Sequence, residues 1–172
     1  MKTTGEDAKG LFTLSSGQFL PIALLFLVSI AIRLGMLLLT ASPGYTGWYG
    51  DVYHHWQIAY YTLHIGLTQS PPRMWDLNGM EYYWGILPAL IQAFLFWVFN
   101  TASLMPFQIF NSVMGSMSCC VVYLICRRYF SRRVGLVAGF LMAVNPVIVV
   151  SDISGMYEPI GILLLLTAVY FY

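Results

Sequence analysis

Long apolar runs alternate with short polar segments along this chain, and they predict helices that cross a membrane. After a polar N-terminus at residues 1–18, residues 19–40 are apolar over about the 20 residues that a spanning helix needs. Residues 104–126 form a second run of this length, and residues 134–150 form a third near the lower limit. Residues 159–172 begin a fourth that is too short to span, so we expect a fragment or a piece of a larger protein.

The segment between the first two runs, residues 41–103, contains two shorter helical patterns. Apolar and aromatic residues recur at helical spacing in residues 51–67, whereas the histidines occupy other positions. Residues 82–99 are aromatic and apolar but interrupted by Gly85 and Pro88. Abundant Trp and Tyr favour the headgroup region. Both patterns therefore predict interfacial helices within a long external loop.

Basic residues predict the orientation of the chain. Residues 127–133 carry four arginines, which favours the cytoplasmic side. If the N-terminus is also cytoplasmic, residues 82–99 cannot cross, and the acidic loop 151–158 reaches the same outer face as Asp51. In the alternative, residues 82–99 cross, the N-terminus is outside and Asp51 is cytoplasmic.

The composition agrees with this topology. Hydrophobic residues make up 59% of the chain and charged residues 9%, whereas about a quarter of the residues in a soluble domain are charged. A net charge of +1 gives no case for nucleic-acid binding. Three cysteines in one apolar run have no metal-site spacing and are expected to pack as small hydrophobes. We therefore expect an all-α integral membrane protein with about four transmembrane helices, the last one truncated, that contacts membrane lipids.

Several polar residues are candidates for chemistry. Asp51 follows a glycine at a helix start, where it can cap the helix, accept a proton from a substrate hydroxyl, or both. His54 and His55 are spaced so that one of them could share a metal with Asp51, given a third acidic ligand. That ligand would come from Asp152 or Glu158, although Glu158 also suits the start of a helix.

Arg33 lies inside the first apolar run, where an unpartnered cation costs several kcal/mol. One interpretation is that its side chain extends to the nearby interface. The other is that it faces an anionic group, such as a lipid phosphate, at the mouth of a cavity.

An ordered series of short motifs resembles a known enzyme class. Asp51-Val52-Tyr53 opens the first external loop. Further along stand Asn78-Gly79-Met80-Glu81-Tyr82-Tyr83-Trp84, Asn145-Pro146 and Met156-Tyr157-Glu158-Pro159. The series resembles the GT-C fold glycosyltransferases, which take sugars from polyprenyl-phosphate donors. It is most similar to the branch of protein O-mannosyltransferases and lipid A aminoarabinose transferases.

The resemblance implies roles for these residues. Asp51 would be the catalytic base, and Glu158, or else Asp152, would hold a divalent metal or the donor phosphate. Arg33, Glu158 and His54 would contact the donor phosphate, and Asp51, Glu158 and His55 would be the metal ligands. The acid that usually follows the first one is here Val52, and a Lys-Pro-Pro motif is missing, which argues against the aminoarabinose donor.

The expected function is transfer of a sugar from a polyprenyl-phosphate donor to an acceptor hydroxyl on a protein, glycan or lipid. The reaction would take place on the non-cytoplasmic face of the plasma membrane in a prokaryote or of the endoplasmic reticulum in a eukaryote. The alternative is a non-catalytic component of a lipid-linked-sugar flippase or transporter, or a membrane assembly subunit. In either case, we expect the rest of a larger protein or a partner subunit to complete the assembly.

Overall fold

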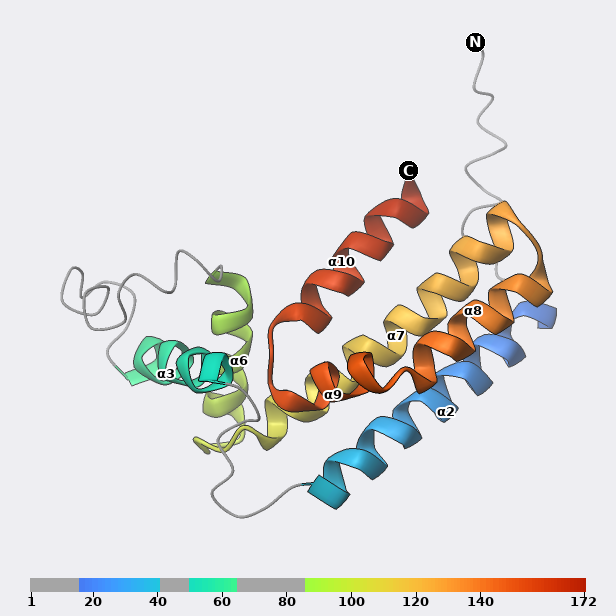
Figure 1. Cartoon of the computed structure of the whole chain (residues 1–172). Helices are drawn as coiled ribbons and strands as arrows, with labels where there is room; N and C mark the ends of the chain where they lie inside the picture. Colours follow the sequence, from blue (N-terminus) through green and yellow to red (C-terminus); the bar gives the residue numbers. More distant parts are fainter. Residues whose placement is uncertain (1–15, 41–49, 65–85) are drawn as a thin grey trace, which may run out of the picture.

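The protein is built from helices (Figure 1). A computed structural model describes residues 16–40, 50–64 and 86–172, and no strand occurs among them. The helices are α2 (Ser16–Thr40), α3 (Gly50–His64), α6 (Ile86–Val98), α7 (Met105–Tyr129), α8 (Arg132–Val144), α9 (Pro146–Ser154) and α10 (Glu158–Phe171). The prediction of an all-α membrane protein is confirmed.

Two helices are long and apolar enough to cross a membrane, namely α2 over Phe19–Thr40 and α7. A third span results if α8 and α9, which meet at a bend of 56°, are counted as one. The apolar helix α10 has 14 residues and is shorter than a span requires. The described residues thus provide two or three candidate spans, where the sequence predicted four with the last truncated.

The third predicted span differs from the structure because the helix breaks at Asn145. Pro146 has no N–H to donate, and it disfavours the helical conformation for the residue before it. Asn145 accordingly adopts φ −65° and ψ 118°, and its side chain accepts hydrogen bonds from the N–H groups of Val147 and Ile148. The new helix α9 continues to Ser154, so Asp152 lies in a helix rather than in the predicted loop at residues 151–158.

Other boundaries differ for simple reasons. The predicted basic loop at residues 127–133 is largely helical, because α7 continues to Tyr129 and α8 begins at Arg132 after a short turn capped by Ser131. The predicted interfacial helices correspond to α3 and α6, which are not candidate spans. Residues 1–15, 41–49 and 65–85 lie outside the described part, and so do the predictions made for them, including the motif at residues 78–84.

Helix α7 lies at the centre of the bundle, packed against α2, α8 and α10 (Figure 1). Its small residues are buried, as expected for close helix packing: Ser112, Gly115, Ser116, Ser118 and Cys119. A side chain at Gly115 would overlap the carboxylate of Asp152 on α9. On α8, a methyl group added at Gly135 or Gly139 would press on the α7 backbone carbonyls of Tyr123 and Cys119. The glycines at these three positions therefore allow the close approach of α7, α8 and α9.

Helices α3 and α6 pack on each other beside the end of the bundle where α7 begins (Figure 1). Ala59 of α3 and Ala93 and Phe96 of α6 form a buried apolar cluster between them. The indole of Trp56 donates a hydrogen bond of 2.7 Å to the carbonyl of Ala102, just before α7. This contact fixes α3 against the segment that enters the bundle. The helix pair therefore lies beside the turn between α9 and α10, where the second acidic cluster is found.

Candidate functional site

Helix α3 meets the α9–α10 turn through a pair of stacked rings. The imidazole of His55 and the ring of Tyr157 lie 3.8 Å apart between centroids, at an interplanar angle of 7°. The Tyr157 hydroxyl lies 3.2 Å from the backbone carbonyl of His55 and 3.3 Å from the side-chain oxygen of Gln92, to which it can donate. Segments that are about 100 residues apart in sequence are thereby joined. The sequence predicted no role for Tyr157 or Gln92, since neither side chain stands out as a reactive group.

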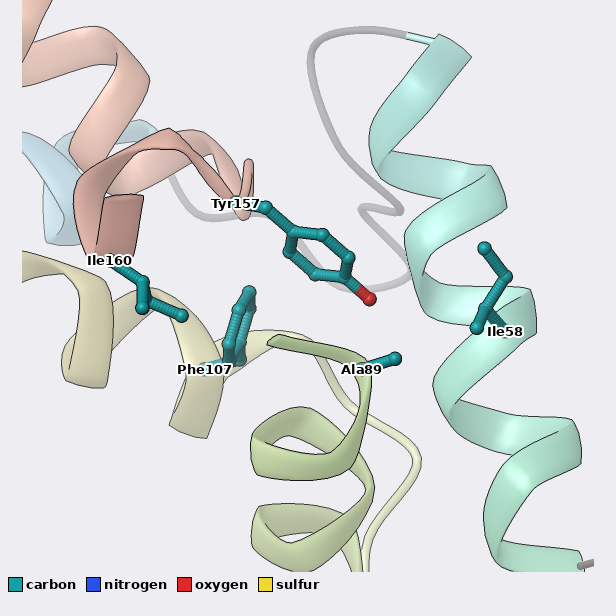
Figure 2. Close-up of a cluster of buried hydrophobic side chains, with 5 residues drawn as sticks. All are labelled: Ile58, Ala89, Phe107, Tyr157 and Ile160. Atoms are coloured by element: carbon teal, nitrogen blue, oxygen red, sulfur yellow. The ribbon is translucent and has the colours of Figure 1, made fainter. Parts of the chain in front are cut away.

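Tyr157 also belongs to an apolar cluster that joins four parts of the chain. Figure 2 shows its ring between α3 and α7, with the hydroxyl directed toward α3 and α6. The ring of Phe107 meets it edge-on, with centroids 5.8 Å apart. The buried members of the cluster are Ile58, Ala89, Phe107, Tyr157 and Ile160. Each buried ring of this size removes about 150–250 Å² from water or lipid, so the cluster sets the position of the turn.

Polar side chains of α7 hold the backbone of the same turn. Gln108 donates a hydrogen bond of 2.9 Å to the carbonyl of Ile153, and Asn111 donates one of 2.6 Å to the carbonyl of Met156. Between them, Gly155 ends α9 with φ +91°, a left-handed conformation that a side chain disfavours. Glu158 then becomes the first residue of α10 and is exposed. The acid is thus presented by a backbone that α7 holds at Ile153 and Met156.

A pocket of about 320 Å³ opens where α3, α6 and α10 meet. It brings together two of the predicted site residues, His55 and Glu158. The complete lining is His55, Leu87, Pro88, Tyr157, Glu158, Ile160, Gly161 and Leu164. The volume is at the lower end of the range of about 300–1,000 Å³ found for ligand pockets. One acidic and one imidazole side chain therefore border a space that is otherwise lined mainly by apolar groups.

Asp51 lies one helical turn before His55, on the same side of α3. It is the second residue of the helix, inside its first turn, where a carboxylate is favourable for the helix dipole. Its side chain is half-buried, and its charge acts on His55. His54 is directed differently, with Nδ1 3.3 Å from the side-chain oxygen of Gln57. Asp51 therefore lies one turn from the lining residue His55, and neither Asp51 nor His54 lines the pocket.

Arg33 is placed inside the bundle, away from the interface and from this pocket. Its side chain is fully buried, so it does not extend to the membrane surface. Nε lies 2.7 Å from Oδ2 of the equally buried Asp152, and Nη1 donates to both oxygens of Ser29 and to the carbonyl of Ala143. That carbonyl lies at the end of α8, next to the break at Asn145. Arg33 and Asp152 thus pair with each other, and neither lines the pocket.

The residues suggested for a metal do not form a ligand set. Asp51, His55 and Glu158 are all described, yet no group of three His, Cys, Asp or Glu side chains in residues 16–40, 50–64 and 86–172 could hold a metal ion. Zinc needs three or four such ligands, and Mg²⁺ or Ca²⁺ takes six or more oxygens, part of them from water. The described residues therefore supply too few ligands for a metal at this pocket.

Burial changes the chemistry of His55. Loss of contact with water lowers the pKa of His55 from 6.5 to about 4, although the negative charge of Asp51 and a hydrogen bond with the Gly155 backbone oppose the shift. Residue 55 lies three positions from both Val52 and Ile58, so it shares their buried face, whereas the sequence analysis grouped it with the polar positions. At neutral pH, His55 is therefore an uncharged ring that packs on Tyr157.

The low pKa of His55 predicts a loss of stability in acid. Between pH 6.5 and about 4 the unfolded chain binds a proton at this position that the folded chain does not, so stability falls as pH falls through that window. The full shift corresponds to about 3 kcal/mol. His55→Phe keeps a ring against Tyr157 but cannot titrate, so its melting temperature in detergent should fall less between pH 7 and 4.

His64→Phe is the matched control, since His64 is an exposed histidine on the same helix. It should retain the pH dependence of the wild type. If His55→Phe and the wild type lose the same amount of stability in acid, burial of His55 is not the cause.

Comparison with known proteins relates the chain to one family. The model of the family described as "Dolichyl-phosphate-mannose-protein mannosyltransferase" matches residues 84–172. The match covers α6 to α10 and therefore includes Glu158, Asp152 and Tyr157, while Asp51 lies before it. Searches of curated proteins and of solved structures give no match.

Proposed function

Since the chain belongs to the dolichyl-phosphate-mannose-protein mannosyltransferase family, we propose that it transfers a sugar from a polyprenyl-phosphate donor to an acceptor hydroxyl. The family makes it a glycosyltransferase of the kind that uses lipid-linked sugars. The acceptor class is a protein, a glycan or a lipid. The proposed site is the pocket between α3, α6 and α10.

The observation that carries the proposal is the meeting of the two acidic segments. His55, one turn after Asp51, and Glu158 border the same pocket, although they are separated by about 100 residues of sequence. Stacking of His55 on Tyr157 and the hydrogen bond from the Tyr157 hydroxyl to the His55 carbonyl join the two segments, and hydrogen bonds from α7 fix the α9–α10 turn. A carboxylate in the pocket lining, Glu158, and a second one turn from the lining residue His55, Asp51, suit a reaction in which one group orients a substrate and another accepts a proton.

Asp51 is the proposed general base. Its half-buried carboxylate accepts the proton of the acceptor hydroxyl as the hydroxyl oxygen attacks the anomeric carbon of the sugar. The bond between that carbon and the phosphate oxygen breaks, and polyprenyl phosphate leaves with the electron pair. Helices α3 and α10 both begin at the site, and the partial positive charge of their N-termini favours the anionic leaving group.

The lining of the pocket supports an amphipathic donor. Leu87, Pro88, Ile160 and Leu164 offer an apolar surface for the first isoprenoid units, and Glu158 offers a hydrogen-bond acceptor for sugar hydroxyls. His54, which does not line the pocket, remains a candidate donor contact. Arg33 has no such role in the proposal, because its nitrogens are engaged with Asp152, Ser29 and Ala143.

The proposed location is the non-cytoplasmic face of the membrane. Arg127, Arg128, Arg132 and Arg133 lie at the α7–α8 turn, and Asp51 and Glu158 lie at the opposite end of α7 (Figure 1). Basic residues near span ends favour the cytoplasmic side. This distribution supports a pocket on the outer or lumenal side and a cytoplasmic N-terminus.

The test is transfer of a labelled sugar from a polyprenyl-phosphate donor by the full-length protein in proteoliposomes. We expect the wild type to label an acceptor and Glu158→Gln to lower the transfer rate about tenfold, since a hydrogen bond to a charged group contributes about 1.5–3 kcal/mol. His64→Gln, at the exposed far end of α3, serves as the control. Movement of the donor across the bilayer without any transfer would instead support the carrier function.

A further inference from the structure

A groove of about 410 Å³ lies between the first half of α2 and α8, separate from the proposed active site. Leu20, Leu24 and Val28 of α2 line one wall, and Leu136 and Phe140 of α8 line the other. Leu20 and Leu24 are each more than half exposed. The two helices lie side by side there (Figure 1). The buried side chain of Leu25 packs between them.

The groove has the length of a single leaflet. Leu20 to Val28 covers about 12 Å of helix at a rise of 1.5 Å per residue. Half of a hydrocarbon core of about 30 Å is about 15 Å. Because these residues begin near the start of α2, the groove extends from one membrane surface toward the middle of the bilayer.

The charge at the surface end of the groove is positive. Arg132, the first residue of α8, is the charged residue of the lining. Arg132 and Arg133 are exposed, and the acidic residues in the described part of the chain, Asp51, Asp152 and Glu158, lie toward the other end of the bundle. Among the described residues no side-chain carboxylate lies at this end, so the exposed guanidinium of Arg132 can pair with an anionic headgroup.

We propose that this groove binds an anionic glycerophospholipid of the adjoining leaflet, with one acyl chain between α2 and α8 and the phosphate on Arg132. An apolar slot alone would accept any lipid chain, whereas the cation at its end selects the headgroup. Basic pockets between transmembrane helices on the cytoplasmic side bind anionic lipids in this way. The site is independent of the glycosyltransferase reaction and lies at the opposite end of α7.

Native mass spectrometry of the detergent-purified full-length protein tests the proposal. The protein is incubated with dioleoyl phosphatidylglycerol or with dioleoyl phosphatidylcholine, and the fraction that retains one lipid is measured. The wild type should retain the anionic lipid preferentially. Arg132→Gln should lower that retention about fivefold, which corresponds to about 1 kcal/mol per basic residue near the membrane surface. Retention of phosphatidylcholine should not change.

Two further variants separate the groove from general surface charge. Arg133→Gln removes an equal charge from the next residue, which does not line the groove, and should change retention less than twofold. Leu24→Trp fills the groove and should lower retention of both lipids. Equal effects of Arg132→Gln and Arg133→Gln, or unchanged retention in Leu24→Trp, would overturn the proposal. A wild type without preference for the anionic lipid would overturn it too.

Discussion

Asp51→Asn is expected to lower the rate of sugar transfer by about 10²–10⁴-fold while the protein still binds its donor. Asparagine has the shape of aspartate but cannot accept the proton of the acceptor hydroxyl. Asp51 is half-buried in the first turn of α3, so the substitution removes a charge without opening a cavity. The measurement compares transfer of labelled sugar with equilibrium binding of the polyprenyl-phosphate donor, both with the full-length protein in detergent.

Asp51→Glu and His64→Gln complete this experiment. Glutamate restores the charge on a longer arm and should recover part of the rate. His64→Gln alters an exposed residue at the far end of the same helix and should transfer sugar at the wild-type rate. If Asp51→Asn transfers at the wild-type rate, Asp51 is not the base. If it loses donor binding in the same proportion as transfer, the carboxylate serves in binding.

Breaking the ion pair between Arg33 and Asp152 is expected to destabilise the folded protein by about 3–5 kcal/mol, because one partner is then left buried without its counter-charge. Both side chains are essentially inaccessible, and Nε and Oδ2 are 2.7 Å apart. Asp152→Asn should be worse than Arg33→Met. An aspartate left alone can take up a proton, whereas a guanidinium remains charged. The measurement is the midpoint of unfolding in a fixed detergent, read from the monomer peak after heating.

The double variant Arg33→Met/Asp152→Asn distinguishes pairing from simple loss of contacts. It removes both charges, so it should be more stable than Asp152→Asn alone. Arg133→Met makes the substitution used at Arg33 in an exposed arginine. Its free energy of unfolding should lie within about 0.5 kcal/mol of the wild-type value. An Asp152→Asn protein as stable as the wild type would contradict the assignment, and so would additive losses in the double variant.

The sequence alone predicted the features that depend on residues close together along the chain. The apolar runs that become α2 and α7 are long and continuous. In lipid such a run favours a helix, because a helix satisfies its own backbone hydrogen bonds. The small residues around Gly115 lie within one of these runs, where they allow close helix packing. By contrast, residues 134–150 form one apolar run in which Pro146 is a weak local signal. The break at Asn145 therefore became visible only in the structure.

The candidate site depends on contacts between distant segments, and these were predicted only in part. The resemblance suggested Asp51 and Glu158, but the stacking of His55 on Tyr157 follows from how α3 docks on the α9–α10 turn. One interpretation of Arg33 was that it extends to the interface, and Asp152 was expected in an outer loop. Only their approach from α2 and α9 shows that they neutralise each other.

Arg33 is synthesised 119 residues before the carboxylate that neutralises it. At about 5–20 residues per second, the ribosome needs about 6–24 seconds to reach Asp152. During this interval α2 must enter the membrane with a charge that costs about 2.5–3.5 kcal/mol at the centre of a helix, offset by its many apolar residues. The bundle can therefore mature only after α9 has emerged, which makes the final packing of the first helix a late event in biosynthesis.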